Sequence, residues 1–303
     1  MHRSILARLI PLLPLAALAL GGMTAPAAAG PVYDRVVERG VLNIGIRTDT
    51  PPFAYVQDGA PRGFTAELCG MMAGAILATS DLEVLDAKVI PVTAENRFDA
   101  LKSGEIDLLC GATTANLTRR ETMSFTIPTF STGIGALVAA DAPALLLELI
   151  NGGPAALSAN ATREGLKGKT LGFQTGTTAE TWVAEKVMPQ LEGAVLMPVD
   201  NHVKGIESVA DGTIDLYFAD KAILSGLLRG LDNAEGFAVS RATFTSEPYA
   251  LAIPRGDEDL RLVMDRALSH IYRSGAIYRL YERYFGKPGT IERVFYSAVA
   301  LPE

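Results

Sequence analysis

The chain has 303 residues, 49% of them hydrophobic, and its formal net charge is −7. Residues 1–29 hold two arginines and no acidic side chain, so the rest of the chain has 25 Lys+Arg against 34 Asp+Glu, a net of −9. This acidic balance and the lack of a basic run argue against a nucleic-acid partner, and the length allows one large domain or two lobes.

The first 29 residues predict a signal peptide. Arg3 and Arg8 give a basic start, residues 9–20 form a short apolar core, and three alanines precede Gly30, so we expect cleavage after Ala29. The apolar run is too short and too interrupted by proline to predict a membrane-spanning helix. We therefore expect an exported, soluble protein.

The chain up to residue 110 alternates between short apolar strands and amphipathic helices. We expect strands at 41–46, 87–92 and 106–110, and helices ending near residue 40 and at 63–78 and 96–103. Such alternation implies a mostly parallel sheet covered by helices, with a ligand site beyond the carboxyl ends of the strands.

Past residue 128 a second series begins. Residues 131–138 and 249–253 are expected to cross between two lobes, and residues 139–163 resemble an inserted helix and loop of no assigned role. Between them we expect strands at 170–174, 194–199 and 214–219, and helices at 178–188, at 202–210 and from 220. Two amphipathic helices, 257–274 and 276–285, are expected to close the chain. A lobe interrupted by a second lobe predicts a cleft that closes by hinge bending.

Two cysteines, Cys69 and Cys110, predict a disulfide in an exported protein. The first lies in the predicted helix 63–78, and the second ends a predicted strand that could pack beneath that helix. Two free buried thiols are the alternative. Neither cysteine has a histidine partner in the sequence, so we expect neither a metal nor a cofactor.

Three arginines, Arg47, Arg97 and Arg119, lie at or just after predicted strand ends, so we expect them to converge on one rim. The last belongs to residues 108–120, where Asn116 or Thr118 can cap a short helical turn. Free backbone N–H groups, a threonine hydroxyl and a guanidinium together suit a carboxylate. The alternative for Arg119 is an ordinary turn with a solvated arginine.

The second series offers polar groups at its own strand ends. Thr178 begins a predicted helix, so its N–H and hydroxyl can bind an anion. Asp220 could accept from an ammonium group, or it could be an ordinary helix N-cap. His202 lies at a similar junction, and the alternative for it is a capping or surface histidine.

Several motifs together resemble the periplasmic amino-acid-binding proteins of ABC importers, which form solute-binding protein family 3. The resemblance covers nearly all of the chain after the signal peptide and is nearest to the glutamate/aspartate-binding branch. Its most specific pieces are GIRTDTPPFAY at 45–55, NR at 96–97, CGATTANLTR at 110–119, TGTT at 175–178 and YERYFG at 281–286.

The resemblance implies a fold, a location and partners. The fold is the α/β type II periplasmic-binding-protein fold, with two sheets joined by two crossing strands around a cleft. It implies a first lobe at 30–132 plus 249–303 and a second lobe at 133–248. We therefore expect a periplasmic monomer that binds an acidic amino acid and delivers it to a membrane ABC permease.

Residue roles follow from the same resemblance. Arg119, Thr114 and the backbone N–H of Ala112 match positions that hold the ligand's α-carboxylate. Asp220 matches the acceptor of the α-ammonium, and Thr178 matches a donor from the second lobe. The positions that surround the side-chain carboxylate in the acidic branch correspond to Arg47, Arg97 and His202.

Two departures weaken the match to the acidic branch. Ala94 and Ala112 stand where that branch tends to have serines, which removes up to two ligand hydrogen bonds of about 0.5–1.5 kcal/mol each. This leaves open a receptor for another polar amino acid or dicarboxylate. Further alternatives are an exported enzyme on the same scaffold, resembling cyclohexadienyl dehydratase, and a module that reports ligand to a membrane sensor.

Overall fold

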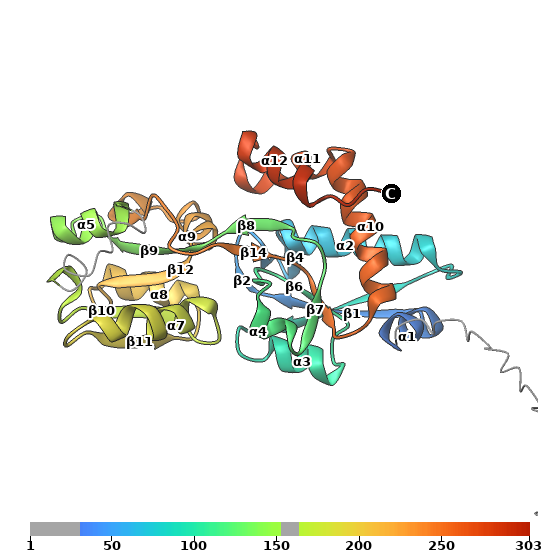
Figure 1. The fold of residues 1–303 in the computed structure, drawn as a ribbon, viewed down its shortest axis with the longest axis horizontal. Coiled ribbons are helices and arrows are strands. Elements are labelled where there is room, and N and C mark those ends of the chain that lie inside the picture. The colour runs from blue at the N-terminus through green and yellow to red at the C-terminus, as the bar shows by residue number, and fades with distance from the viewer. Residues whose placement is uncertain (1–30, 153–163) are drawn as a thin grey trace, which may run out of the picture.

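The structure is a computed structural model that describes residues 31–152 and 164–303 (Figure 1). The predicted signal peptide with its cleavage site, and residues 153–163 of the predicted insertion, lie outside the described residues. Two five-stranded sheets, each covered by helices, form two lobes joined by the antiparallel strands β8 (Phe130–Thr132) and β14 (Glu247–Tyr249). The predicted α/β two-lobed architecture is confirmed.

The first lobe contains a mixed sheet. Its strands in order are β5 (Asp86–Val92), β1 (Val41–Arg47), β6 (Leu108–Cys110), β15 (Ala252–Pro254) and β7 (Met123–Phe125). Strand β1 pairs in parallel with β5 and β6, whereas β15 is antiparallel to β6 and β7. Helix α1 (Pro31–Arg39) precedes these strands, and α2 (Phe64–Thr79), α3 (Arg97–Ser103) and α4 (Leu117–Arg120) lie between them in the chain. A small sheet follows β1 and consists of β2 (Asp49–Thr50), β3 (Ala54–Gln57) and β4 (Ala60–Arg62).

The second lobe has a sheet of the same size. Its strands in order are β11 (Val195–Val199), β10 (Thr170–Gln174), β12 (Leu216–Asp220), β9 (Ile134–Ala139) and β13 (Phe237–Val239). Its helices are α5 (Ala144–Asn151), α7 (Thr178–Trp182), α8 (His202–Ala210) and α9 (Lys221–Leu228). The prediction of one α-helix over 178–188 is wrong, because a π-helical turn at Val183–Val187 and a 3₁₀ turn at Met188–Gln190 follow α7. Pro189, which cannot donate to an α-helical ladder, lies in that last turn.

The two crossing segments are shorter than predicted. Strand β8 (Phe130–Thr132) pairs with β14 (Glu247–Tyr249), and β9 then starts the second sheet. The predicted crossing strand at 249–253 is therefore wrong beyond Tyr249, since β15 already belongs to the first sheet. The cause is tertiary, because the apolar run around residues 249–253 is divided between two sheets: β14 pairs with β8, and β15 pairs with β6 and β7.

The chain ends in three helices, not the predicted two: α10 (Glu258–Arg273), α11 (Ala276–Phe285) and α12 (Thr290–Val299). The start of α12 is closed by the Glu292 side chain, which accepts from the Gly289 N–H at 2.8 Å. Phe285 of α11 packs against Phe130 of β8 with ring centroids 4.6 Å apart, and Phe130 packs edge-on against Phe53 at 4.9 Å. This aromatic cluster anchors a crossing strand to the first lobe.

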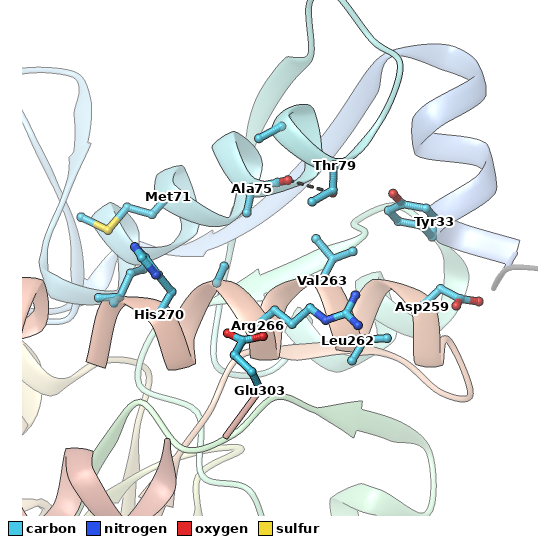
Figure 2. A pocket seen from close by; sticks show the side chains of 13 residues that line it. Tyr33, Met71, Ala75, Thr79, Asp259, Leu262, Val263, Arg266, His270 and Glu303 are labelled. Carbon is cyan, nitrogen blue, oxygen red and sulfur yellow. Dashed lines mark hydrogen bonds between the residues drawn. The ribbon is translucent and has the colours of Figure 1, made fainter. Parts of the chain in front are cut away.

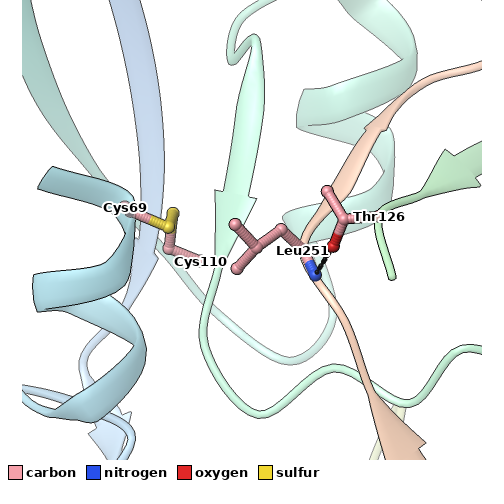
Figure 3. The surroundings of a disulfide bond; sticks show 4 residues. All are labelled: Cys69, Cys110, Thr126 and Leu251. Carbon is pink, nitrogen blue, oxygen red and sulfur yellow. Dashed lines mark hydrogen bonds between the residues drawn. A yellow bond between two sulfur atoms is a disulfide. The ribbon is translucent and has the colours of Figure 1, made fainter. Parts of the chain in front are cut away.

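The predicted disulfide is present. Cys69 of α2 is bonded to Cys110 at the end of β6, with their Cα atoms 6.4 Å apart (Figure 3). Closing a loop of 41 residues stabilises the fold by about 4 kcal/mol in the chain-entropy model. The bridge fixes the helix to the strand immediately before the residues that form the candidate site.

Candidate functional site

A narrow cavity lies between the lobes, and both lobes contribute side chains to it. Its lining consists of Arg47, Arg97, Ala112, Thr114, Arg119, Thr177, Thr178, Ala179, His202, Ala219, Asp220 and Ile223. All eight residues that the sequence singled out are among them, including the three strand-end arginines. The cavity has a volume of about 20 Å³, roughly the room of one water molecule. The lining side chains therefore leave little of this cavity empty.

Arg119 is held by its local turn and by an aromatic ring. Asn116, not Thr118, caps α4 and accepts from the Arg119 backbone N–H at 2.9 Å. The guanidinium donates from Nη1 to the Thr114 carbonyl at 2.8 Å and lies 4.8 Å from the centroid of the Phe98 ring. Burial lowers the pKa of this guanidinium, while the charge of Glu247 opposes that shift. Arg119 is therefore not the solvated arginine of the alternative interpretation.

Arg97 begins α3 and is almost fully buried, with 2% of its surface exposed. Its guanidinium donates to the Ala94 carbonyl and, across the lobes, from Nη2 to the Gly176 carbonyl at 2.8 Å. Its Nε is buried with no hydrogen-bond partner, and it has no ion pair with any carboxylate of the described residues. Burial and the charge of Arg47 lower its pKa well below the usual value. Arg97 is thus a buried cation with an unused donor.

Arg47 ends β1 and is also 2% exposed, but its donors are engaged. Nε and Nη2 donate to the two carboxylate oxygens of Asp49 at 2.7 and 2.9 Å, and Nη2 also donates to Gln174 Oε1 at 3.2 Å. Gln174 lies in the second lobe and donates from Nε2 to Asp49 Oδ2 at 2.8 Å. This group therefore links the lobes.

Sequence reasoning missed Asp49 and Gln174. A signal for Asp49 exists, because it follows Arg47 by two residues in extended chain, where alternate side chains share a face. Burial would raise the pKa of Asp49, but the hydrogen bonds and charge of Arg47 outweigh it and lower the pKa to about 2. No comparable local signal marks Gln174, because its partners in the first lobe, Asp49 and Arg47, are 125 and 127 positions away.

His202 is neither a cap nor a surface residue, so the alternative interpretation of it is wrong. It is 3% exposed, and Asn201 caps α8 in its place. Its Nδ1 is 2.9 Å from the Tyr217 hydroxyl. Burial and the charge of Arg47 lower the pKa of His202 to about 3, so the imidazole is neutral at physiological pH.

Asp220 stands at the N-cap position of α9 but makes no capping hydrogen bond with its side chain. Its Oδ1 is buried and makes no hydrogen bond of normal geometry, and the same is true of Glu247 Oε2 and the Tyr249 hydroxyl on the crossing strand. The Tyr249 hydroxyl nevertheless lies close enough to Asp220 to lower its pKa in part. Burial, with the charge of Glu247, raises the pKa of Asp220 to about 7. The N-cap alternative therefore does not account for this carboxylate.

A larger hollow lies elsewhere, on the outside of the first lobe. The groove runs between α2 and α10 and has a volume of about 710 Å³ (Figure 2). Met71 and Ala75 face Val263 and His270 across it. Its lining is mainly apolar, and none of the unpartnered buried polar atoms lies there. The interlobe cavity is the better candidate because of its chemistry, not its size.

Within residues 31–152 and 164–303, no helix is both long and apolar enough to cross a membrane. Within the same ranges, no three His, Cys, Asp or Glu side chains are grouped so that they could hold a metal ion.

A two-lobed fold with a charged cavity between its lobes is the architecture of a solute-binding protein. The sequence profile of the bacterial extracellular solute-binding proteins, family 3, matches residues 42–287. The chain therefore belongs to that family.

The individual relatives have low sequence identity to this chain. The chain is 23% identical over 286 residues to an L-glutamate/L-aspartate-binding protein of Pseudomonas aeruginosa, covering 93% of this chain and 89% of the relative. It is 25% identical over 256 residues to an L-cystine-binding protein of Escherichia coli, covering 84% and 86%. A solved structure of an ancestral arginine-binding protein bound to arginine superposes with a TM-score of 0.69 at 26% identity, covering 82% of this chain and 99% of that one. These three proteins differ in the amino acid they are named for.

Proposed function

We propose that the protein is an exported receptor that binds an amino acid between its lobes and delivers it to an ABC permease. One observation carries the proposal. The cavity has a buried cationic donor without a partner, Arg97 Nε, and a buried acceptor without a partner, Asp220 Oδ1. Unpaired buried groups of this kind are costly. An amino acid would satisfy Asp220 with its α-ammonium and Arg97 with an acceptor on its side chain.

Arg119 and Asp220 would bind the common part of the ligand. The α-carboxylate would lie at Arg119, with the Thr114 hydroxyl and the Ala112 backbone N–H as further donors. The α-ammonium would lie at Asp220, whose carboxylate would ionise beside it. Arg119 belongs to the first lobe and Asp220 to the second, so one ligand would bridge them. Such bridging gives the closed form its higher affinity.

We further propose that an acidic amino acid, glutamate or aspartate, is the preferred ligand. Three arginines line the cavity, and Arg97 has no carboxylate partner among the described residues, so a second negative charge would have a counterion there. Glutamate and aspartate are also the ligands for which the Pseudomonas relative is named.

A second candidate is a neutral polar amino acid such as glutamine or asparagine. Asp49 favours it, because this carboxylate already pairs with Arg47 through two hydrogen bonds. Ala94 and Ala112 also provide fewer hydroxyl donors than we expect in an acid-specific site.

The test is calorimetric titration of ligand-stripped, refolded protein with glutamate, aspartate, glutamine and asparagine. We expect tighter binding of the acids than of their amides. Heat only from the amides would replace the first candidate by the second, and no heat from any of the four would refute both. Incubation with prephenate and arogenate tests the enzyme alternative, for which turnover would be the positive result.

A further inference from the structure

The arginine that the sequence assigns to the ligand's second carboxylate already binds a carboxylate of its own chain. Asp49 engages the Nε–Nη2 edge of Arg47 with both oxygens, at 2.7 and 2.9 Å. This two-point arrangement is the geometry in which a guanidinium best recognises a carboxylate. Gln174 takes a further contact on Nη2, so Nη1 is the one nitrogen that these two residues leave unused.

The Arg47 side chain also packs closely against Gly111. Gly111, with φ of 155°, lies against its side chain, and a Cβ at that position would come within 2.9 Å of Arg47 Cγ. A larger residue at position 111 would therefore push the Arg47 side chain out of this place. A ligand carboxylate that sought the Nε–Nη2 edge would have to displace Asp49, which is itself anchored by Gln174 at 2.8 Å.

The charges of the site support the same conclusion. The low pKa of Asp49, about 2, keeps its carboxylate ionised, and His202 beside this group is neutral. The Arg47–Asp49 pair therefore contributes no net charge to its end of the cavity. A second carboxylate on the ligand would therefore meet one uncompensated cation, Arg97. Counting arginines alone would suggest two uncompensated cations, Arg47 and Arg97.

We propose that Asp49 is a specificity-determining residue: it occupies the carboxylate site of Arg47 and so lowers the preference of the receptor for acidic amino acids over their amides. This inference rests on the proposed function. Asp49 acts through Arg47 and does not itself need to touch the ligand.

A purely structural role for Asp49 is the competing explanation. Arg47, Arg97 and Arg119 share one cavity, and a carboxylate among them relieves their mutual repulsion. Loss of that relief would lower stability and weaken every ligand by a similar factor. A change in the ratio of acid to amide affinity that depends on Arg47 would not follow from it.

The experiment compares glutamate and glutamine affinities of the full chain by calorimetric titration. In Asp49→Asn we expect the ratio of glutamate to glutamine affinity to rise by about ten- to a hundredfold, the value of one charged hydrogen bond. In an Arg47→Met background, Asp49→Asn should leave the ratio unchanged. The control is Asp58→Asn, which removes the same charge from an exposed turn of the same lobe where φ is 53°, a conformation that asparagine tolerates.

Each outcome decides something. A ratio that rises only when Arg47 is present supports the inference. An unchanged ratio in a folded, binding-competent Asp49→Asn overturns the inference about Asp49 but leaves the proposed function standing. An equal rise of the ratio in Asp58→Asn has the same two consequences. No binding of either ligand by any folded variant or by the unaltered protein refutes the proposed function and the inference with it. If thermal melting shows that Asp49→Asn does not fold, Asp49→Ser makes the same comparison.

Discussion

The two ends of the interlobe cavity are built on opposite principles. At one end, around Arg119 and Asp220, polar atoms are buried without partners. At the other end, Arg47, Asp49 and Gln174 satisfy one another through four hydrogen bonds, at 2.7, 2.9, 3.2 and 2.8 Å. The first end is prepared for charges that come from outside, while the second is complete within the chain except for Arg97, whose Nε has no partner.

This difference teaches where affinity and specificity would arise in the proposed receptor. An unpaired buried group gains its full hydrogen-bonding energy when a ligand arrives, so the first end would supply most of the affinity. A group that is already paired gains little, because the ligand must first replace an internal partner. The second end would therefore discriminate among side chains only weakly.

The largest expected effect comes from the unpaired end. Arg119→Ala should weaken every α-amino acid by about a hundredfold or more, because it leaves the ligand's α-carboxylate without its cation. Titration with glutamate and glutamine measures it, and both should lose affinity alike. Arg120→Ala is the matched control, since Arg120 is exposed and its loss should cost no more than about twofold. Retained binding in Arg119→Ala would reverse our assignment of the two ends.

A smaller effect is expected from pH. Burial, with the charge of Glu247, raises the pKa of Asp220 to about 7, so below that pH the free protein carries a protonated acid there. An ammonium needs the carboxylate, so binding must release the proton. Affinity should therefore fall as pH drops below 7, by up to about tenfold per unit, and level off above it.

Titrations from pH 5.5 to 8 in buffers of different ionisation enthalpy measure both the affinity and the released proton. His202 should not contribute, because its pKa of about 3 lies below this range. Asp220→Asn should bind more weakly and without the pH dependence. A slope that persists in Asp220→Asn would place the titrating group elsewhere.

The smallest effect is expected at the paired end. Gln174→Ala removes the hydrogen bonds that join the second lobe to Arg47 and Asp49. The closed form should lose stability, and glutamate and glutamine should both weaken by about three- to tenfold, as for one neutral hydrogen bond. Titration of both ligands checks this. Unequal losses of glutamate and glutamine affinity would mean that Gln174 contacts the ligand side chain. The second end of the cavity would then bind ligand directly, and the two ends would no longer differ in this respect.

Local patterns were sufficient for much of the fold. Apolar runs and helix periodicity placed β1 and α8 to within about a residue, and the composition of an exported chain predicted the Cys69–Cys110 bridge. Local patterns failed where one apolar run forms two strands that pair in different sheets, as β14 and β15 do. The helix α12 was also missed, although Gly289 and Glu292 form a readable start signal.

The sequence by itself determined which groups could meet: three arginines at strand ends, Asp220 and His202 at junctions, and a sheet whose carboxyl edges bring such groups together. Only the tertiary structure decided how those groups are paired. Asp49 engages Arg47, Tyr217 contacts His202, and Asp220 is left with a free buried oxygen. The physical reason is that pairing depends on burial and on contacts between residues of different lobes that are more than a hundred positions apart in the chain, such as Gln174 and Arg47. Local periodicity does not encode such contacts.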